Sequence, residues 1–190
     1  MTLDREAAWD LLCEYTKSDS LRRHALGVEQ AMRKMAAKVD GDPDLWGITG
    51  LLHDFDYERY PTAEEHPFKG VAILREKGYP EEMLEAIMGH ATYTGVARQT
   101  PMAKALFAVD ELVGFIFAVT YVRPSKSILE VKPKSVKKKL KQRSFAASVN
   151  RDDISQGMEE LGLDPTEHIQ FVIDALAEKA EELGLKGDPA

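Results

Sequence analysis

The chain has 190 residues and a mass of 21.2 kDa, and 44% of its residues are hydrophobic and 30% charged. This balance is typical of one soluble globular domain and excludes a disordered chain, a collagen and a multi-span membrane protein. The net charge of −7 argues against a general nucleic-acid-binding protein. Cys13 is the single cysteine, and the chain start lacks the features of an export signal, so we expect a cytoplasmic protein without disulfides or a thiolate zinc site.

Residues typical of helix starts and helix ends recur along the whole chain. No long run alternates between apolar and polar residues as a β-strand does. A first amphipathic segment spans about residues 4–15. Ser18 or Ser20 caps a longer segment in which apolar residues recur at helical spacing. The pair Asp42-Pro43 opens a third helix, which we expect to end near residue 53.

Two further helices are predicted after a loop. Thr62 to Glu65 matches a capping box, so we expect a helix from there to Lys77, with Pro67 in its first turn. Gly78 is typical of a helix end, and Pro80 begins a fifth helix.

Residues 105–122 form the longest apolar stretch of the chain. This stretch contains Asp110 and Glu111 and is only about as long as the shortest membrane spans, so we expect a buried core helix instead of a span. The helix begins at Thr100-Pro101 and ends before Arg123-Pro124.

The following segment differs in composition, because residues 132–143 hold seven positive charges and no acids, which leaves −14 on the rest of the chain. Three interpretations stay open: a solvated basic helix, a patch for an anionic partner, and a wall of a substrate cavity. Asn150 and Asp164 then open two closing helices. The sequence therefore predicts an all-α fold of about eight helices.

Histidines and acids at helix ends and faces are the candidates for chemistry. His24 lies on the apolar face of the second helix, the pair His53-Asp54 ends the third, and Asp110 lies inside the most apolar helix. A charged Asp110 in a buried helix requires a cation or several donors to offset its desolvation. Imidazole and carboxylate ligands suit manganese, iron, nickel, zinc or magnesium, and neighbouring helices can each contribute one ligand. We therefore predict a divalent-metal site.

The order His24, His53-Asp54, Asp110 resembles the metal-binding signature of the HD-domain superfamily. The stretches 48–54 and 106–112 are similar to the apolar helices that carry the His-Asp pair and the distal aspartate in that family. The resemblance covers roughly residues 21–122 and implies an HD-type helical bundle.

By this resemblance the chain is expected to form a single HD-type helical domain over residues 1–190. Residues 21–122 would be its motif core. Residues 124–184, which hold the basic segment and the C-terminal helices, would pack on that core.

The resemblance also implies a metal-dependent activity. Most characterised members are phosphohydrolases in which the first histidine, the His-Asp pair and the distal aspartate bind a divalent metal. His66 and His90 occupy the places of two further ligands in members with two metals, such as the bacterial diadenosine tetraphosphate hydrolases and the di-iron oxygenases. In that scheme Asp54 bridges two ions, and the ligand sets are His24, His53 and Asp110 for the first ion and His66 and His90 for the second.

The function implied is hydrolysis of a phosphoester or phosphoanhydride in a small, nucleotide-like substrate. A metal-held hydroxide would be the nucleophile, and His53 and Asp54 would be essential for catalysis. Two alternatives stay open: an HD-type di-iron oxygenase with the same ligands, and a regulatory HD module that binds a ligand without turnover. A homodimer is possible, and no nucleic-acid or membrane partner is expected.

Other residues have weaker roles in this hypothesis. Candidate substrate-binding cations are Lys69, Arg98, Arg123 and Lys126. Candidate general acids are Asp56, Glu58, Glu64 and Glu65. His168 falls outside the pattern and is predicted to face solvent.

Overall fold

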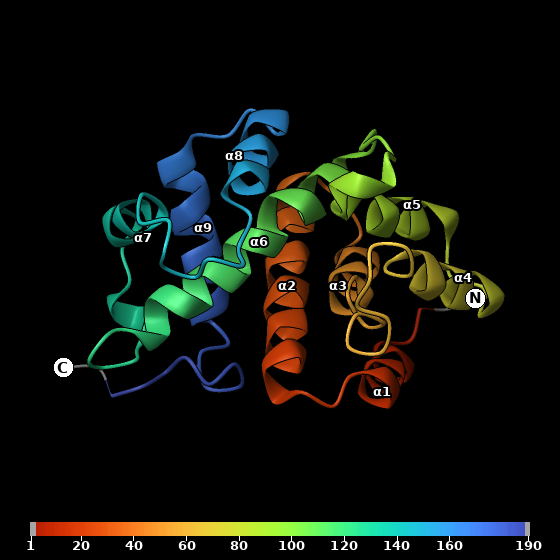
Figure 1. Cartoon of the computed structure of the whole chain (residues 1–190), viewed down its shortest axis with the longest axis horizontal. Coiled ribbons are helices and arrows are strands. Elements are labelled where there is room, and N and C mark those ends of the chain that lie inside the picture. Colours follow the sequence, from red (N-terminus) through yellow and green to blue (C-terminus); the bar gives the residue numbers. More distant parts are fainter. Residues whose placement is uncertain (1–2, 189–190) are drawn as a thin grey trace. The chain divides into compact units, whose positions relative to one another are not determined.

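The chain is entirely helical in the computed structural model, which describes residues 3–188 (Figure 1). Within that range it forms nine α-helices and two 3-10 helices and no β-strand, so the all-α prediction is confirmed. The elements are α1 (Arg5–Tyr15), α2 (Asp19–Lys38), α3 (Pro43–Leu52), α4 (Phe68–Glu76), α5 (Glu81–His90), η1 (Thr92–Thr94), α6 (Pro101–Tyr121), η2 (Ile128–Glu130), α7 (Pro133–Leu140), α8 (Arg151–Glu160) and α9 (Pro165–Ala177). None of the helices in residues 3–188 has the length and apolar character of a membrane span.

Side-chain caps start most of these helices where the sequence predicted them. Asp4 accepts hydrogen bonds from two backbone N–H groups of α1, and Ser18 caps α2. The Asp42 carboxylate accepts from the N–H groups of Asp44 and Leu45 at the start of α3. Each cap satisfies donors that the first turn of a helix leaves without partners.

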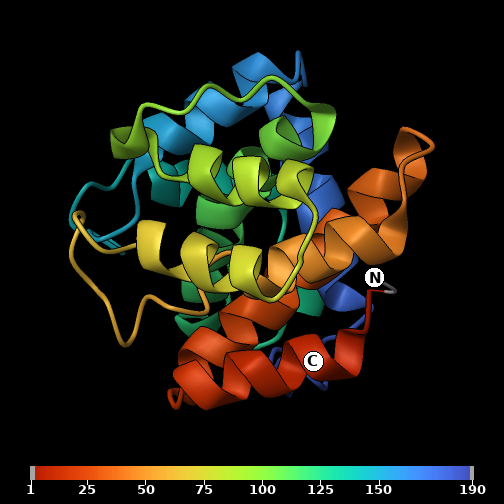
Figure 2. The ribbon, with the colours of Figure 1, turned by 90° about the vertical axis from the view of Figure 1, so that its right-hand side faces the viewer.

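The chain divides into two compact units, Met1–Phe107 and Ala108–Ala190. In the first unit, α2 and α3 pack together closely, and α4 and α5 lie side by side (Figure 2). Gly50 allows the α2–α3 contact, because a Cβ at this position would lie 2.9 Å from the carbonyl oxygen of Val28. Val28 and Met32 of α2 and Ile48 and Leu51 of α3 are fully buried.

The prediction that a helix begins at Thr62 is wrong. Residues 62–67 form turns, and α4 begins only at Phe68, after Pro67. The Thr62 hydroxyl does bond Glu65, but to the side-chain carboxylate at 3.3 Å and not to a backbone N–H group. The local capping pattern is therefore present without the helix that it usually starts.

The second unit is built on α9, whose apolar face is buried through Ile169, Val172, Ile173 and Leu176. Helix α7, in the basic segment, packs against α9 and buries Val136. Gly157 of α8 lies against Ala108, where a Cβ would approach the Ala108 Cα to 2.6 Å. The basic segment is thus a folded helix with an apolar side; the packing of residues 124–184 on residues 21–122 stays a prediction.

Arg151, the first residue of α8, organises the loop between α7 and α8. Its guanidinium donates hydrogen bonds to five backbone carbonyl oxygens, those of Leu140, Gln142, Phe145, Ala146 and Val149. A planar group with five donors is suited to this role, and a lysine is not.

Candidate metal centre

The packing of α2 on α3 brings the first predicted ligands together. His24 projects from α2, and the His53 ring, fully buried directly after α3, lies 5.4 Å from it between ring centroids. Asp54 follows in the turn and keeps 26% of its side chain exposed. Within the first unit, one ligand atom from each of His24, His53 and Asp54 lies within 4.8 Å of the others. Asp110 lies on helix α6, in the second unit, and its place in the ligand set stays a prediction.

A second group of ligand atoms shares Asp54. The Nε2 atoms of His66 and His90 each lie 3.1 Å from Asp54 Oδ1, and the other carboxylate oxygen, Oδ2, lies 3.5 Å from His53 Nε2. Ligand atoms of Asp54, His66 and His90 are mutually within 4.8 Å. Both oxygens of one carboxylate therefore face imidazole nitrogens, which is the arrangement that a carboxylate shared by two ions requires.

Three of the imidazoles are oriented through their Nδ1 atoms. His53 Nδ1 donates to the carbonyl oxygen of Gly50 at 2.7 Å, and His90 Nδ1 donates to that of Ile87. Because a carbonyl oxygen only accepts hydrogen bonds, Nδ1 carries a proton in both rings, and in the neutral form of each ring the lone pair is on Nε2, which faces Asp54. Such bonds fix the tautomer and the direction of histidines that bind metals.

The third imidazole, His66, is held by Asp56. Asp56 is buried, and its Oδ1 accepts from His66 Nδ1 at 2.8 Å while its Oδ2 accepts from the Gly70 N–H at 2.8 Å. A Cβ at Gly70 would lie 2.6 Å from Asp56 Cγ, so only glycine allows this approach. Asp56 was one of four acids near the His-Asp pair, and its role was not visible because His66 is ten residues away.

Two of the other acids have local structural partners. Glu58 accepts from the backbone N–H groups of Lys17 and Ser18 at the start of α2, and these bonds lower its pKa. Glu65 forms an ion pair with Lys69 at 2.6 Å. The identity of a general acid stays open.

The electrostatics favour an ionised Asp54 among the imidazoles. Burial by itself raises the pKa of Asp54, but the charge of His53 and hydrogen bonds from His53, His66 and His90 outweigh it and hold the pKa well below its usual value. For His66, burial lowers the pKa, whereas hydrogen bonds to Asp54 and Asp56 and the charges of both carboxylates raise it to about 9. In the metal-free protein His66 is therefore protonated at neutral pH.

Two tyrosines next to His66 were not predicted. The Tyr93 hydroxyl donates to the His66 carbonyl oxygen at 2.9 Å, and the Tyr57 ring lies edge-on to the His66 ring at 5.3 Å. Both tyrosines are partly exposed, at 55% and 42% respectively. The only hint in the sequence is that each lies three residues after a candidate ligand, Tyr57 after Asp54 and Tyr93 after His90.

Three of the four predicted substrate-binding cations contact protein groups through their side chains. Besides its ion pair with Glu65, Lys69 lies over the Tyr60 ring; Arg98 donates to the Gly89 carbonyl oxygen and stacks on Phe107. Arg123 pairs with Glu130 at 3.1 Å, and Lys126 is exposed, with a positive φ of 50°. A role for these residues in substrate binding stays a prediction.

The prediction for His168 is wrong. This residue is 3% exposed, and its Nε2 donates to the carbonyl oxygen of Ala108 at 2.9 Å. His168 thus satisfies a backbone acceptor of α6 inside the second unit, as a buried polar group must.

Comparison with known families gave one match. Residues 21–113 match the family model described as HD domain. The chain therefore contains an HD domain over this range, and its predicted membership of the HD-domain superfamily is confirmed. Searches of curated proteins and of solved structures gave no match. HD-domain proteins are generally metal-dependent hydrolases, and the His and Asp groups described above could hold divalent metal.

Proposed function

We propose that this protein is a metal-dependent phosphohydrolase that cleaves a phosphoester or phosphoanhydride bond in a small, nucleotide-like substrate. The observation that carries the proposal is the sharing of Asp54 between two groups of ligand atoms, one with His24 and His53 and the other with His66 and His90. Two adjacent divalent ions suit attack at phosphorus, because both the entering and the leaving oxygens carry negative charge.

The donor set fits hard or borderline divalent ions. It contains only imidazole nitrogens and carboxylate oxygens, which suit manganese, iron, nickel, zinc or magnesium. When bound, such ions polarise a phosphoryl oxygen and lower the pKa of water, so that hydroxide is available near neutral pH.

The protein's own contribution is to hold the ligands in place. The Nδ1 bonds of His53, His66 and His90 keep their Nε2 atoms directed at Asp54 before any ion arrives. The low pKa of Asp54 keeps it ionised over the whole physiological range. Preorganised ligands of this kind reduce the cost of ordering the site when it binds metal and substrate.

The test combines metal analysis with an activity screen. Protein purified without chelators is analysed for metals and assayed against phosphorylated metabolites with added manganese, iron or nickel. We expect bound metal and release of phosphate from at least one nucleotide-like substrate, and we expect His53→Ala with Asp54→Ala to abolish both while helical circular dichroism persists. Turnover that survives in this variant refutes the assignment.

The same experiment separates the alternatives. Anaerobically purified protein that contains iron and consumes O2 with a non-phosphorylated substrate would indicate a di-iron oxygenase. Protein that binds metal and a phosphorylated ligand without any product would indicate a regulatory module. Either result would replace the proposed hydrolysis.

A further inference from the structure

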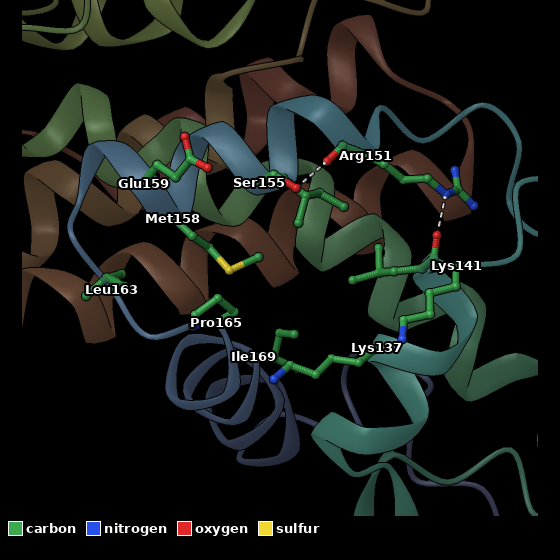
Figure 3. A pocket seen from close by; sticks show the side chains of 11 residues that line it. Lys137, Lys141, Arg151, Ser155, Met158, Glu159, Leu163, Pro165 and Ile169 are labelled. Atoms are coloured by element: carbon green, nitrogen blue, oxygen red, sulfur yellow. Dashed lines mark hydrogen bonds between the residues drawn. The ribbon is translucent and has the colours of Figure 1, made fainter.

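The second unit contains a cavity of about 740 Å³ between α7, α8 and α9 (Figure 3). Its size falls in the range of small-molecule binding sites, which is roughly 300–1,000 Å³. The cavity is built only from residues of the Ala108–Ala190 unit and contains none of the candidate metal ligands.

The walls of the cavity are aliphatic. They are formed by Leu140, Ile154, Met158, Leu163, Pro165 and Ile169. No aromatic ring lines the cavity, and the one wall hydroxyl, Ser155, already donates to the Arg151 carbonyl oxygen at 3.1 Å. Such walls suit a flexible aliphatic chain, because they offer neither stacking surfaces nor polar partners.

Charge is distributed unevenly around this cavity. Lys137 and Lys141 lie on its α7 side, and Glu159 lies at the α8 end, away from both lysines (Figure 3). The Lys137 ammonium reaches the Thr166 hydroxyl at the start of α9, and Lys141 is exposed. The guanidinium of Arg151 is turned toward the carbonyl oxygens of the α7–α8 loop. The cations that face a ligand are therefore the two lysines.

We propose that this cavity binds a single-chain amphiphile with one anionic head group, of the acyl carboxylate type. The chain would lie between Ile154, Met158 and Ile169, and the head group would lie at the α7 side, near Lys137 and Lys141. Glu159 disfavours the opposite orientation, because it would repel an anion at the α8 end. The proposal is independent of the metal centre.

Methionine methyl NMR tests where the ligand binds. Met158 lines the cavity and is the one methionine in the sequence of the Ala108–Ala190 unit. Its signal, assigned with Met158→Leu, therefore reports on this cavity. Decanoate is titrated below its micelle concentration into the full chain with ¹³C-methyl-labelled methionine. We expect the Met158 signal to shift saturably, with affinity rising roughly fourfold for each added methylene group. A Met158 signal that does not move, or equal shifts of all methionines, contradicts the proposal.

A second comparison tests the role of charge. We expect decanol to bind more weakly than decanoate, and Lys137→Met with Lys141→Met to weaken decanoate binding about five- to tenfold, the size of two partly screened charge contacts. The matched control is Lys134→Met with Lys138→Met, which removes the same charge from exposed positions of α7 that do not line the cavity. We expect less than a twofold change in the control. Equal losses of decanoate affinity in both double variants, or decanol binding as tight as that of decanoate, would contradict the proposal that the ligand has an anionic head group.

Discussion

The metal centre and the aliphatic cavity use charged groups in opposite ways. In the centre, His53, His66 and His90 are buried and held by hydrogen bonds that fix the direction of each ring. At the cavity, Lys137 and Lys141 reach the rim on flexible stems from the surface of α7. Replacing a metal ligand by a side chain with other donor atoms should therefore impair the centre. Replacing a rim lysine by another cation should have little effect if the rim selects ligands by charge.

The largest expected effect follows from a change of one atom in the shared ligand. Asp54→Asn keeps the size of the side chain but removes the charge that both groups share and replaces one of the two ligand oxygens by an amide nitrogen. We expect turnover to fall by about 10³-fold or more, because the charge stabilisation that metals supply is worth several kcal/mol. Activity assays and metal analysis measure this. Asp42→Asn, which conserves the cap at the other end of α3, is the control and should retain both metal and activity.

A smaller loss is expected from the residue that holds His66. Asp56→Ala removes the acceptor for His66 Nδ1 and for the Gly70 N–H, so His66 loses its orientation. Losing such a partner costs about 10–100-fold in metal affinity, and we expect this loss for the second ion only. Chelator competition resolves the two ions. If the first ion is lost equally, Asp56 maintains the fold and does not specifically position His66.

The contact between α2 and α3 gives the third prediction. Gly50→Ala places a Cβ 2.9 Å from the Val28 carbonyl oxygen, so the two helices must move apart. We expect the free energy of unfolding to fall by about 1–3 kcal/mol, as in other overpacked cores. Affinity for the first ion should also fall, because His24 lies on α2 and His53 directly follows α3. Denaturant unfolding measures the free energy of unfolding, and metal titration measures the affinity for the first ion. An unchanged free energy of unfolding would show that the two helices can move apart without loss of stability.

The pH dependence of the metal-free protein is a fourth test. The pKa of His66 is raised to about 9 from an ordinary value of 6.5, so its protonated form stabilises the fold. This contribution is fully present below about pH 6.5 and is lost as the pH rises through about 9. With a chelator present, we expect the wild type to lose more stability between pH 6 and pH 9 than His66→Gln. Parallel pH profiles for the two proteins would contradict the ion pairing of His66.

The smallest expected effect concerns the cavity rim. Lys137→Arg with Lys141→Arg retains both charges, so we expect decanoate affinity to change less than about twofold. Isothermal titration measures this. A loss as large as that of the methionine double variant would mean that the rim, like the metal centre, selects by geometry.

Helix boundaries were predictable where the signal is local. Asp42, Asn150 and Asp164 each cap the helix that follows them, and the groups involved are within three residues of one another. The turns at residues 62–67 were not predictable in this way. The capping pattern of Thr62 occurs there, but the chain becomes helical only at Phe68.

Side-chain roles that depend on distant partners were the hardest to predict. His168 was expected at the surface because it lies near the start of the last helix, but it is buried against the Ala108 carbonyl oxygen, 60 residues away. Asp56 was one of several acids until its contact with His66 was known. His24, His53, Asp54 and Asp110 were candidates because of their residue types and positions, and the family resemblance added His66 and His90. No local pattern predicts that His24 and His53 meet.

The number of ions bound per chain tests the central claim most directly. Metal-free protein is titrated with manganese, and the stoichiometry is measured by calorimetry for the wild type and for His66→Ala with His90→Ala. We expect two ions for the wild type and one for the variant, because His24, His53 and Asp54 remain. A wild type that saturates with a single ion, or a variant that still takes two, would contradict a carboxylate shared between two metals.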